Sequence, residues 1–476
     1  MLLKKGGNID NLNKGIYEIK RTFYNIKEPD KLLLFLNDKL KPTEKAKNER
    51  GEVFTPLELV NEMLDKLPIE VWKNPNLKFL DPATGIGNFP VMVYLKLMDG
   101  LKYFEPNQEK RRKHILENML YMVEIDKLNV FLLKKVFCGN TYNLNIFEGS
   151  FVKETNNKKV DILFGNKPIN KKENLEFEKK ISEIKFDIIL GNPPFQEEYK
   201  NNKKKPKNNN LWTIFLSNSY ELLKYNGYLL LITPTSWMSP SFKNKNIFYK
   251  NWLIYVNINE CKKWFPTVGS QFSYYLIQKT TQKKETNVIC KYNKKIYKST
   301  LLISNNLEFI PSILTKESLS IIKKFYNNDI EKISFVRSYE ITTSKKLLIG
   351  KCNNKYKYPI KDTKKNTDLC SSIKHSLQDK NKIIMSRSGN LEPIYDNGIY
   401  GITENLLYLL TNKKNYINIL NSKLFNFIFE ICKSSGYHNP EIFKDIPIIT
   451  ENKTDEELYK IFKLTKDEIK LINEII

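Results

Sequence analysis

The chain has 476 residues, of which 78 are Lys or Arg and 53 are Asp or Glu, so its formal net charge at pH 7 is +25. A hydrophobic fraction of 41% excludes a disordered polymer, and the length allows two or three domains. The positive excess suits a polyanionic partner such as nucleic acid, although the abundance of Lys, Asn and Ile throughout the chain would also produce it through codon bias.

The cysteine and histidine content and the N-terminal residues argue against a metal site and against membrane association. Six cysteines are scattered without a CxxC pair, and there are three histidines. This inventory argues against a zinc site and against a disulfide framework, so we expect no metal and a reducing, cytoplasmic compartment. The first residues, MLLKKGGNID, lack an apolar signal segment, and no apolar run approaches membrane-spanning length. We therefore expect no membrane association.

Residues 1–48 form a polar, lysine-rich N-terminal extension with one short apolar stretch. From there to about residue 298, strand-like apolar runs alternate with helical patterns. The candidate strands are 77–82, 119–126, 186–194, 227–234 and 272–279. Alternation of this kind predicts an α/β, Rossmann-like, doubly wound sheet, which binds its ligands at the carboxyl ends of its strands.

The alternation fades in the last third of the chain. Residues 299–450 contain short β-like runs between Lys/Asn-rich loops, which predicts a second, mixed α/β domain. Residues 451–476 have an amphipathic helical pattern and are expected to form a C-terminal helical tail. Within the first domain, the segment 197–210 is almost free of apolar residues and is predicted to be a mobile loop.

The stretch FLDPATGIGNFPVMVYL (79–95) predicts a strand ending at Asp81, a turn with Gly85 and Gly87, and a helix. Such a turn lets backbone N–H groups and a helix N-terminus approach a ligand, although a structural tight turn is the commoner explanation of a lone GxG. Pro90 stands at the third glycine position of a dinucleotide fingerprint, which argues against a nicotinamide enzyme. Glu124, at the next strand end, suits a ribose diol because a carboxylate accepts two hydroxyl hydrogen bonds.

Thr55-Pro56-Leu57-Glu58 has the pattern of a helix capping box with proline at the first helical position. That structural role alone would account for Thr55. A helix start just ahead of a glycine turn could also hold a ligand carboxylate, so both interpretations stay open.

The motif GNPPF (191–195) ends a buried strand abruptly. Two prolines supply no N–H donors, so the sheet ladder stops and the loop is stiff. The side-chain oxygen of Asn192 and the carbonyl of Pro193 are then two adjacent acceptors, which match an exocyclic amino group. Phe195 offers a flat apolar surface on which a nucleobase can stack, an interaction of ~1–3 kcal/mol per base.

Taken together, FTP (54–56), DPATGIGNF (81–89), VEID (123–126) and GNPPF resemble S-adenosylmethionine-dependent amino-methyltransferases. The order of the motifs, with a large C-terminal region last, is similar to the γ-class N6-adenine DNA methyltransferases of TaqI type. The resemblance covers about residues 45–285 by motif. It implies that residues 49–298 are a methyltransferase domain and that 299–450 are a target-recognition domain.

The resemblance also implies roles for single residues. S-adenosylmethionine would contact Thr55, Asp81, Gly85, Gly87, Glu124 and, through its adenine, Asn140 in FCGNTYN (137–143), where the family usually has an acidic residue. Asn192, Pro193 and Phe195 would be catalytic, and Phe265 would pack on the other face of a flipped adenine. For DNA binding we expect phosphate contacts from Lys203, Lys204 and Lys205, and a guanine contact from Arg387. A solvated linker and a surface arginine are the structural alternatives for these residues.

The expected function is therefore site-specific methylation of adenine N6 in double-stranded DNA, with extrusion of the base. One alternative keeps the same core but acts on RNA or on a protein glutamine. Another is a non-catalytic DNA-binding specificity protein, against which the intact Asn192, Phe195 and glycine turn argue. The region before Thr55 is too short for a nuclease domain, so any restriction endonuclease would be a separate partner chain.

Overall fold

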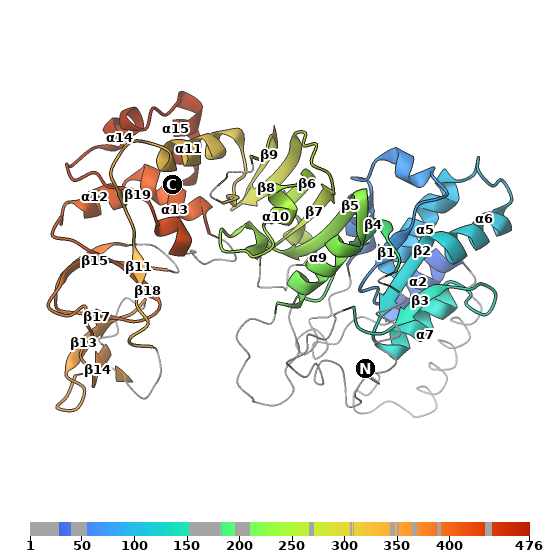
Figure 1. Ribbon diagram of the computed structural model, residues 1–476, viewed down its shortest axis with the longest axis horizontal. Helices are drawn as coiled ribbons and strands as arrows, with labels where there is room; N and C mark the ends of the chain where they lie inside the picture. Colours follow the sequence, from blue (N-terminus) through green and yellow to red (C-terminus); the bar gives the residue numbers. More distant parts are fainter. Residues whose placement is uncertain are drawn as a thin grey trace.

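The computed structural model describes residues 28–39, 55–151, 181, 183–195, 210–265, 271–304, 307, 309–342, 348–349, 352–363, 369–387, 392–433 and 440–476 (Figure 1). The first half of the chain is built on a nine-stranded sheet with the order β3-β2-β1-β4-β5-β7-β6-β8-β9. Its strands are β1 (Phe79–Asp81), β2 (Leu120–Glu124), β3 (Asn145–Glu148), β4 (Phe186–Gly191), β5 (Leu223–Pro234), β6 (Trp252–Ile258), β7 (Phe272–Gln278), β8 (Thr286–Tyr292) and β9 (Lys295–Leu301).

Strands β1 to β5 pair in parallel, and β7 runs antiparallel between β5 and β6. The chain moves outward from β1 in both directions, to β2 and β3 on one side and to β4 and β5 on the other. A doubly wound sheet binds ligands where the strand order reverses, outside the carboxyl ends. Here that point lies between β1 and β4. The predicted α/β, doubly wound sheet is confirmed.

All five predicted strands are present, but β3, β6, β8 and β9 were not predicted. β3 is partly exposed along its whole length, and every residue of β9 except Leu301 is exposed or half-buried. Strands at a sheet edge, such as β3 and β9, bury only part of their surface, so their sequences lack the continuous apolar run that identifies a central strand. β6, in contrast, is an inner and largely buried strand, and edge exposure does not account for it.

Helices cover both faces of the sheet. The helical segments of this half are α2 (Pro29–Lys39), α4 (Leu57–Leu64), η1 (Ile69–Trp72), α5 (Asn88–Gly100), α6 (Gln108–His114), η2 (Ile115–Met119), α7 (Lys127–Val136), α9 (Leu211–Leu222), η3 (Thr235–Met238), α10 (Asn246–Tyr249) and η4 (Glu260–Trp264). Alternate residues of β5 enter two cores: Leu230 packs with α4, α5 and α7, whereas Leu229 and Leu231 pack with α9. Leu32 and Leu33 of α2 are buried in the first of these cores, so this part of the predicted N-terminal extension packs on the sheet domain.

The C-terminal half combines helices with three small sheets. Its helical segments are α11 (Lys316–Tyr326), α12 (Tyr416–Leu420), α13 (Lys423–Ile431), η5 (Pro440–Phe443), α14 (Asp455–Ile461) and α15 (Lys466–Ile475). The sheets have the orders β10-β19, β11-β18-β15-β16 and β12-β14-β13-β17. The strands are β10 (Lys332–Ile333), β11 (Val336–Arg337), β12 (Leu348–Ile349), β13 (Tyr358–Lys361), β14 (Leu369–Ser371), β15 (Asn381–Ser386), β16 (Ile394–Asn397), β17 (Gly401–Ile402), β18 (Leu406–Leu410) and β19 (Ile446–Pro447).

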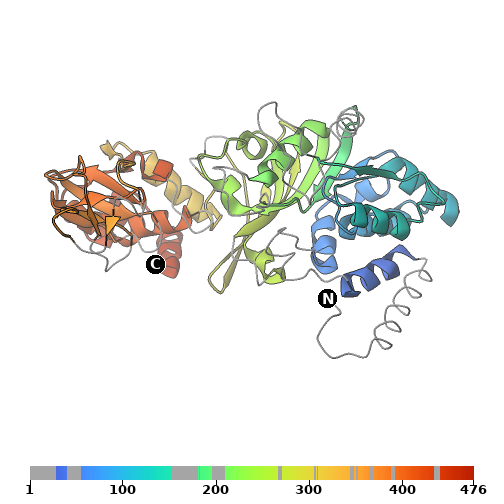
Figure 2. The ribbon, with the colours of Figure 1, turned by 90° about the horizontal axis from the view of Figure 1, so that it is seen from below.

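Figures 1 and 2 show that the C-terminal helices lie between two parts of the structure. On one side are β8 and β9 of the large sheet, and on the other are the two four-stranded sheets. The hydroxyl of Tyr292 in β8 donates to Glu430 in α13 across 3.0 Å, and one hydrophobic core runs from the large sheet into these helices. α14 and α15 pack against α13, and α15 also packs against α11. The segment that we predicted as a separate helical tail is therefore part of this C-terminal body.

The amphipathic pattern of the last residues divides into two helices because each begins at its own threonine. The hydroxyls of Thr454 and Thr465 accept N–H groups in capping boxes completed by Glu457 and Glu468. Two caps eleven residues apart favour two short helices over one long one.

The structure contains a disulfide that the sequence analysis did not predict. Cys352, which follows β12, and Cys370 of β14 are joined by a disulfide, with their Cα atoms 5.1 Å apart. The pairing of β12 with β14 brings these cysteines together, and their spacing in sequence gave no sign of it. Within the described residues, no group of three or more His, Cys, Asp or Glu could hold a metal ion. No helix in this part of the chain combines the length and the apolar character that a membrane crossing requires.

Candidate active site

Asp81 ends β1 at the point where the strand order reverses, and it is only 3% exposed. Its Oδ1 accepts the N–H of Ala83 across 3.0 Å, whereas its buried Oδ2 accepts no hydrogen bond from the described residues. Burial, helped by the nearby Glu124, raises the pKa of Asp81 to about 8. A buried acceptor without a donor is costly, so this oxygen fits a ligand that brings a cation or an N–H or O–H group.

The two glycines of the turn after β1 serve different purposes. Gly85 has a φ of +57°, and a Cβ built on it would meet no atom of the described residues within 4 Å. Gly87 has a φ of +106°, and its Cβ would lie 2.9 Å from Cδ2 of Leu133 in α7. Gly85 therefore borders open space, where a ligand can lie against the backbone, and Gly87 allows α5 to pack on α7.

Glu124 ends β2 and fixes the shape of this turn. One carboxylate oxygen, Oε2, accepts the N–H of Gly85 across 2.7 Å, and the other, Oε1, accepts the N–H of Asp126 across 2.8 Å. Burial raises the pKa of Glu124 to about 7, although these two bonds favour the charged form. Each carboxylate oxygen can accept a second hydrogen bond, so the predicted contact with a pair of hydroxyl groups remains compatible with this geometry.

The GNPPF loop lies directly against Asp81. Gly191 ends β4 with a φ of +154°, and a Cβ on it would lie 2.8 Å from Oδ1 of Asp81. Glycine at this position therefore brings the loop into contact with the end of β1. Pro193 and Pro194 follow and end the strand, as predicted.

Thr55 joins the loop to the helices. Its hydroxyl oxygen accepts a hydrogen bond from Nδ2 of Asn192 across 3.1 Å, and its backbone carbonyl accepts one from Nδ2 of Asn88 across 2.7 Å. The predicted capping box is wrong: α4 begins at Leu57, its N-cap is Pro56, and no side chain caps it. The Thr55 side chain is directed to Asn192 instead of to the helix N-terminus.

Three phenylalanines meet at the same edge of the sheet. The ring of Phe272 lies 6.3 Å from that of Phe195 and 5.0 Å from that of Phe265, measured between centroids. Phe272 pairs with Pro234 at the carboxyl end of β5, so this cluster stands beside the GNPPF loop. We had selected Phe195 and Phe265 from the sequence but missed Phe272, because nothing local distinguishes it from the other apolar residues of β7.

The fold contradicts the prediction for Asn140. This residue is exposed in the turn between α7 and β3, before the strand begins. A few residues on, Asn145 donates to the carbonyl of Leu120, which starts β2, so this turn lies at the amino edge of the sheet. Asp81 and Glu124 lie at the opposite, carboxyl edge. Ser150, the second residue after the end of β3, lies at that edge and is buried, and the sequence did not point to it because β3 itself was not predicted.

The predicted DNA-binding residues are only partly described. Lys203, Lys204 and Lys205 lie outside the described residues, as does most of the predicted loop 197–210. Arg387 follows β15, and its backbone N–H donates to the carbonyl of Asn405.

Arg337, which sequence reasoning missed, lies at the same end of the sheet β11-β18-β15-β16 as Arg387. Strands β11 and β15 lie on either side of β18: Arg337 of β11 pairs with Leu407, and Ser386, the residue before Arg387, pairs with Leu406. Its guanidinium stacks on Tyr339 at 4.6 Å from the ring centroid. Two arginines from separate strands therefore lie at one end of the four-stranded sheet.

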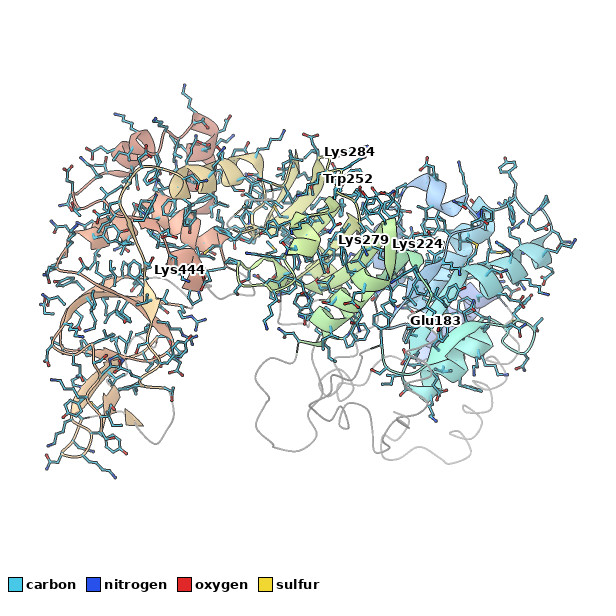
Figure 3. The ribbon with its side chains drawn as sticks, viewed as in Figure 1. Glu183, Lys224, Trp252, Lys279, Lys284 and Lys444 are labelled. Atoms are coloured by element: carbon cyan, nitrogen blue, oxygen red, sulfur yellow. A yellow bond between two sulfur atoms is a disulfide. The ribbon has the colours of Figure 1, made fainter. Side chains whose placement is uncertain are left out.

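Some of the positive charge has structural partners. Figure 3 labels Lys224, Lys279 and Lys284 near the amino ends of β5, β6 and β8. Lys224 pairs with Asp187 at 2.9 Å, and Lys279 donates to two carbonyls at the end of α9. Lys284 lies over the ring of Trp252. These lysines stabilise the fold, so they do not by themselves indicate a nucleic-acid surface.

Comparisons with known proteins agree with this geometry. Residues 118–265 match the family described as Eco57I restriction-modification methylase, a range that includes GNPPF and Phe265. An uncharacterized adenine-specific methylase of Mycoplasma pneumoniae is 33% identical over 135 residues, which are 27% of this chain. The match spans about a third (32%) of the length of that relative.

Two solved structures share the fold over most of the chain. A nuclease-deletion mutant of the type ISP restriction-modification enzyme LlaGI, in complex with a DNA substrate mimic, has a TM-score of 0.53 and 13% identity, covering 96% of this chain and 58% of that one. The type IIL restriction-modification enzyme MmeI, in complex with DNA, has a TM-score of 0.50 and 12% identity, covering 84% and 68%.

Proposed function

We propose that this chain, which carries an Eco57I-type restriction-modification methylase domain, is a DNA adenine-N6 methyltransferase that uses S-adenosylmethionine. The observation that carries the proposal is the contact between two sites. The loop that offers acceptors to an amino group, GNPPF, packs through Gly191 on Asp81, the buried carboxyl group that has an oxygen without a donor. A methyl donor and an amino acceptor held by these two sites would be neighbours.

The residues at the carboxyl edge fit the cofactor. Asp81 would pair with its cationic methionine end, Gly85 would allow its close approach, and Glu124 would accept hydrogen bonds from its ribose. When bound, S-adenosylmethionine supplies a methyl group that is electrophilic because it is attached to a sulfonium. In place of Asn140, we assign Ser150 to the side of the cofactor's adenine, because it lies two residues beyond the end of β3 at the same edge.

The GNPPF loop would bind the target base. Oδ1 of Asn192 and the carbonyl oxygen of Pro193 would each accept one hydrogen from the adenine amino group. This would draw the nitrogen out of conjugation with the ring, so that its lone pair could accept the methyl group. The methyl–sulfur bond would break with its electron pair left on the sulfur of S-adenosylhomocysteine, and the amino proton would pass to water. Phe195 and Phe265 would hold the ring, with Phe272 packed against both.

DNA would be bound mainly through its phosphates, and sequence would be read by the C-terminal half. The base pocket specifies one base only, so a longer site needs side chains in a groove. We assign residues 49–298 to catalysis and 299–450 to target recognition, with Arg387 and Arg337 as candidates to read bases. The C-terminal helices 451–476 support this second domain. A cognate restriction endonuclease is a candidate partner, and the protein would act in the cytoplasm.

The test is methyl transfer from radiolabelled S-adenosylmethionine to unmethylated genomic DNA, followed by modification-sensitive sequencing. We expect N6-methyladenine at one sequence. Asn192→Ala should lower kcat by about 10²-fold or more, because a hydrogen bond made in a dry site is lost. Its affinity for S-adenosylhomocysteine, measured by calorimetry, should not change. Labelling of total RNA or protein in place of DNA, or near-normal activity of the variant, would overturn the assignment.

A further inference from the structure

We infer that Thr55 is a positioning residue for the reaction: its hydroxyl oxygen holds the amide of Asn192 so that the amide oxygen faces the target amino group. This inference rests on the proposed function. Thr55 was expected to bind the cofactor or to cap a helix, and the observed hydrogen bond gives it a different role. The bond joins residues 137 positions apart in the chain.

An amide has two ends of nearly the same shape but of opposite hydrogen-bonding character. Nδ2 can only donate, so the atom opposite it in the 3.1 Å contact, Oγ1 of Thr55, is the acceptor. The contact therefore turns Oδ1 to the other side of the amide. In an amide rotated by half a turn, Oδ1 would accept the Thr55 hydroxyl hydrogen and the N–H groups would face those of the adenine. The acceptor pair with Pro193 therefore requires the observed orientation, in which Nδ2 donates to Oγ1.

Thr55 is itself fixed well enough to do this. It is 4% exposed, and its carbonyl accepts the side-chain N–H of Asn88, the first residue of α5. The next residues start α4, whose Leu59 and Val60 are fully buried. Two core helices thus hold the threonine, and the prolines after Asn192 stiffen the loop on the other side. No cap competes for the hydroxyl, because α4 has no side-chain cap.

A positioning role and a cofactor-binding role predict different kinetics. A positioning residue acts on the orientation of Asn192, so its loss lowers kcat and leaves cofactor affinity unchanged. A residue that binds the cofactor raises the Kd for S-adenosylhomocysteine when it is lost. The readouts are kcat for methyl transfer to DNA and that Kd, measured on the full chain.

The decisive variant is Thr55→Val, which keeps the shape of the side chain and removes the hydroxyl. We expect kcat to fall roughly 10- to 100-fold, the range expected for misplacing a reacting group. The Kd should stay within about 3-fold, well under the ~10-fold that 1.4 kcal/mol would produce. Thr55→Ser restores the oxygen and should recover most of the activity. Thr286→Val, which removes another buried threonine hydroxyl bonded to the carbonyl of Leu253, is the matched control and should retain wild-type kcat.

The outcomes separate the two claims. Absence of methyl transfer by the wild-type protein would overturn the proposed function and this inference together. If the wild type is active but Thr55→Val keeps the wild-type kcat, this inference alone is overturned. A raised Kd for S-adenosylhomocysteine in that variant would then indicate that Thr55 binds the cofactor. If Thr55→Val does not fold, as judged by urea denaturation, Thr55→Ala takes its place. In an Asn192→Ala background the valine substitution should have no further effect on kcat.

Discussion

Replacing Asp81 with asparagine should change how the stability of the methyltransferase half depends on pH. Burial raises the pKa of this carboxyl group from 3.8 to about 8 in the ligand-free protein. Between these two pH values the folded chain holds a proton that the unfolded chain has released. Stability therefore falls as pH rises through this window, because the unfolded state binds fewer protons. The amide in the Asp81→Asn variant does not titrate, so the variant loses this contribution.

The size of the effect follows from the size of the pKa shift. One proton of difference corresponds to about 1.4 kcal/mol per pH unit, and a shift of about four units to an upper bound of about 6 kcal/mol. Burial also raises the pKa of Glu124, to about 7, so this residue makes stability fall with rising pH in the acidic part of the same window. The substitution leaves Glu124 in place, so its contribution is common to wild type and variant. Such an amount is a large fraction of the ~5–15 kcal/mol that stabilises a typical domain.

Tryptophan fluorescence reports selectively on this half, because the chain's five tryptophans all lie between residues 72 and 264. Urea unfolding followed by this signal, at pH values from about 5 to 8, gives the free energy of unfolding of wild type and Asp81→Asn. We expect the difference between them to grow in favour of the variant as pH rises, by at most about 1.4 kcal/mol per pH unit. Parallel pH profiles would refute the burial of an uncompensated carboxyl group.

Binding of a cationic ligand should reverse the protonation of Asp81. S-adenosylmethionine would favour the ionised Asp81, so its binding to wild type should release a proton below about pH 8 and strengthen as pH rises toward that value. Calorimetry in two buffers with different ionisation enthalpies measures the released proton. Asp81→Asn should bind more weakly and release less.

Three further predictions concern other parts of the chain. Phe195→Ala should reduce flipping of a fluorescent base analogue at the target position, and Phe272→Ala should do so to a smaller extent because it acts through Phe195; equal flipping by wild type and both variants would contradict the stacking role. Arg387→Ala should relax preference at one base pair at a cost of ~1–3 kcal/mol if the arginine reads a base, whereas uniform weakening across sequences would indicate a phosphate contact. Asp396→Ala should destabilise the C-terminal half by about 3–5 kcal/mol, because it leaves the fully buried ammonium of Lys382 without its carboxylate. Urea unfolding followed by circular dichroism measures the change in the free energy of unfolding. The matched control Lys374→Ala breaks only the exposed pair with Asp379 and should cost at most about 1 kcal/mol.

The sequence alone was sufficient where local chemistry fixes the backbone. The central strands are continuous apolar runs, and they end where glycine or proline stops the ladder, as at Asp81 and in GNPPF. Because parallel strands align their carboxyl ends, these motifs had to meet at one edge of the sheet. The α/β fold and the meeting of Asp81, Glu124 and Asn192 could therefore be predicted from the residues and their order.

Only the tertiary structure decided the contacts between distant segments. Thr55 has the local pattern of a helix cap, yet its hydroxyl binds Asn192, because the packing of α4 and α5 brings Thr55 to the end of β4. The sequence points to Asn140 and gives no sign of Ser150, because β3 is an edge strand with little apolar sequence; only the sheet shows which residues lie at its carboxyl edge. Phe272 gains its place beside Phe195 from the antiparallel register of β7 with β5. In each case the partner lies far along the chain, so no local pattern carries the information.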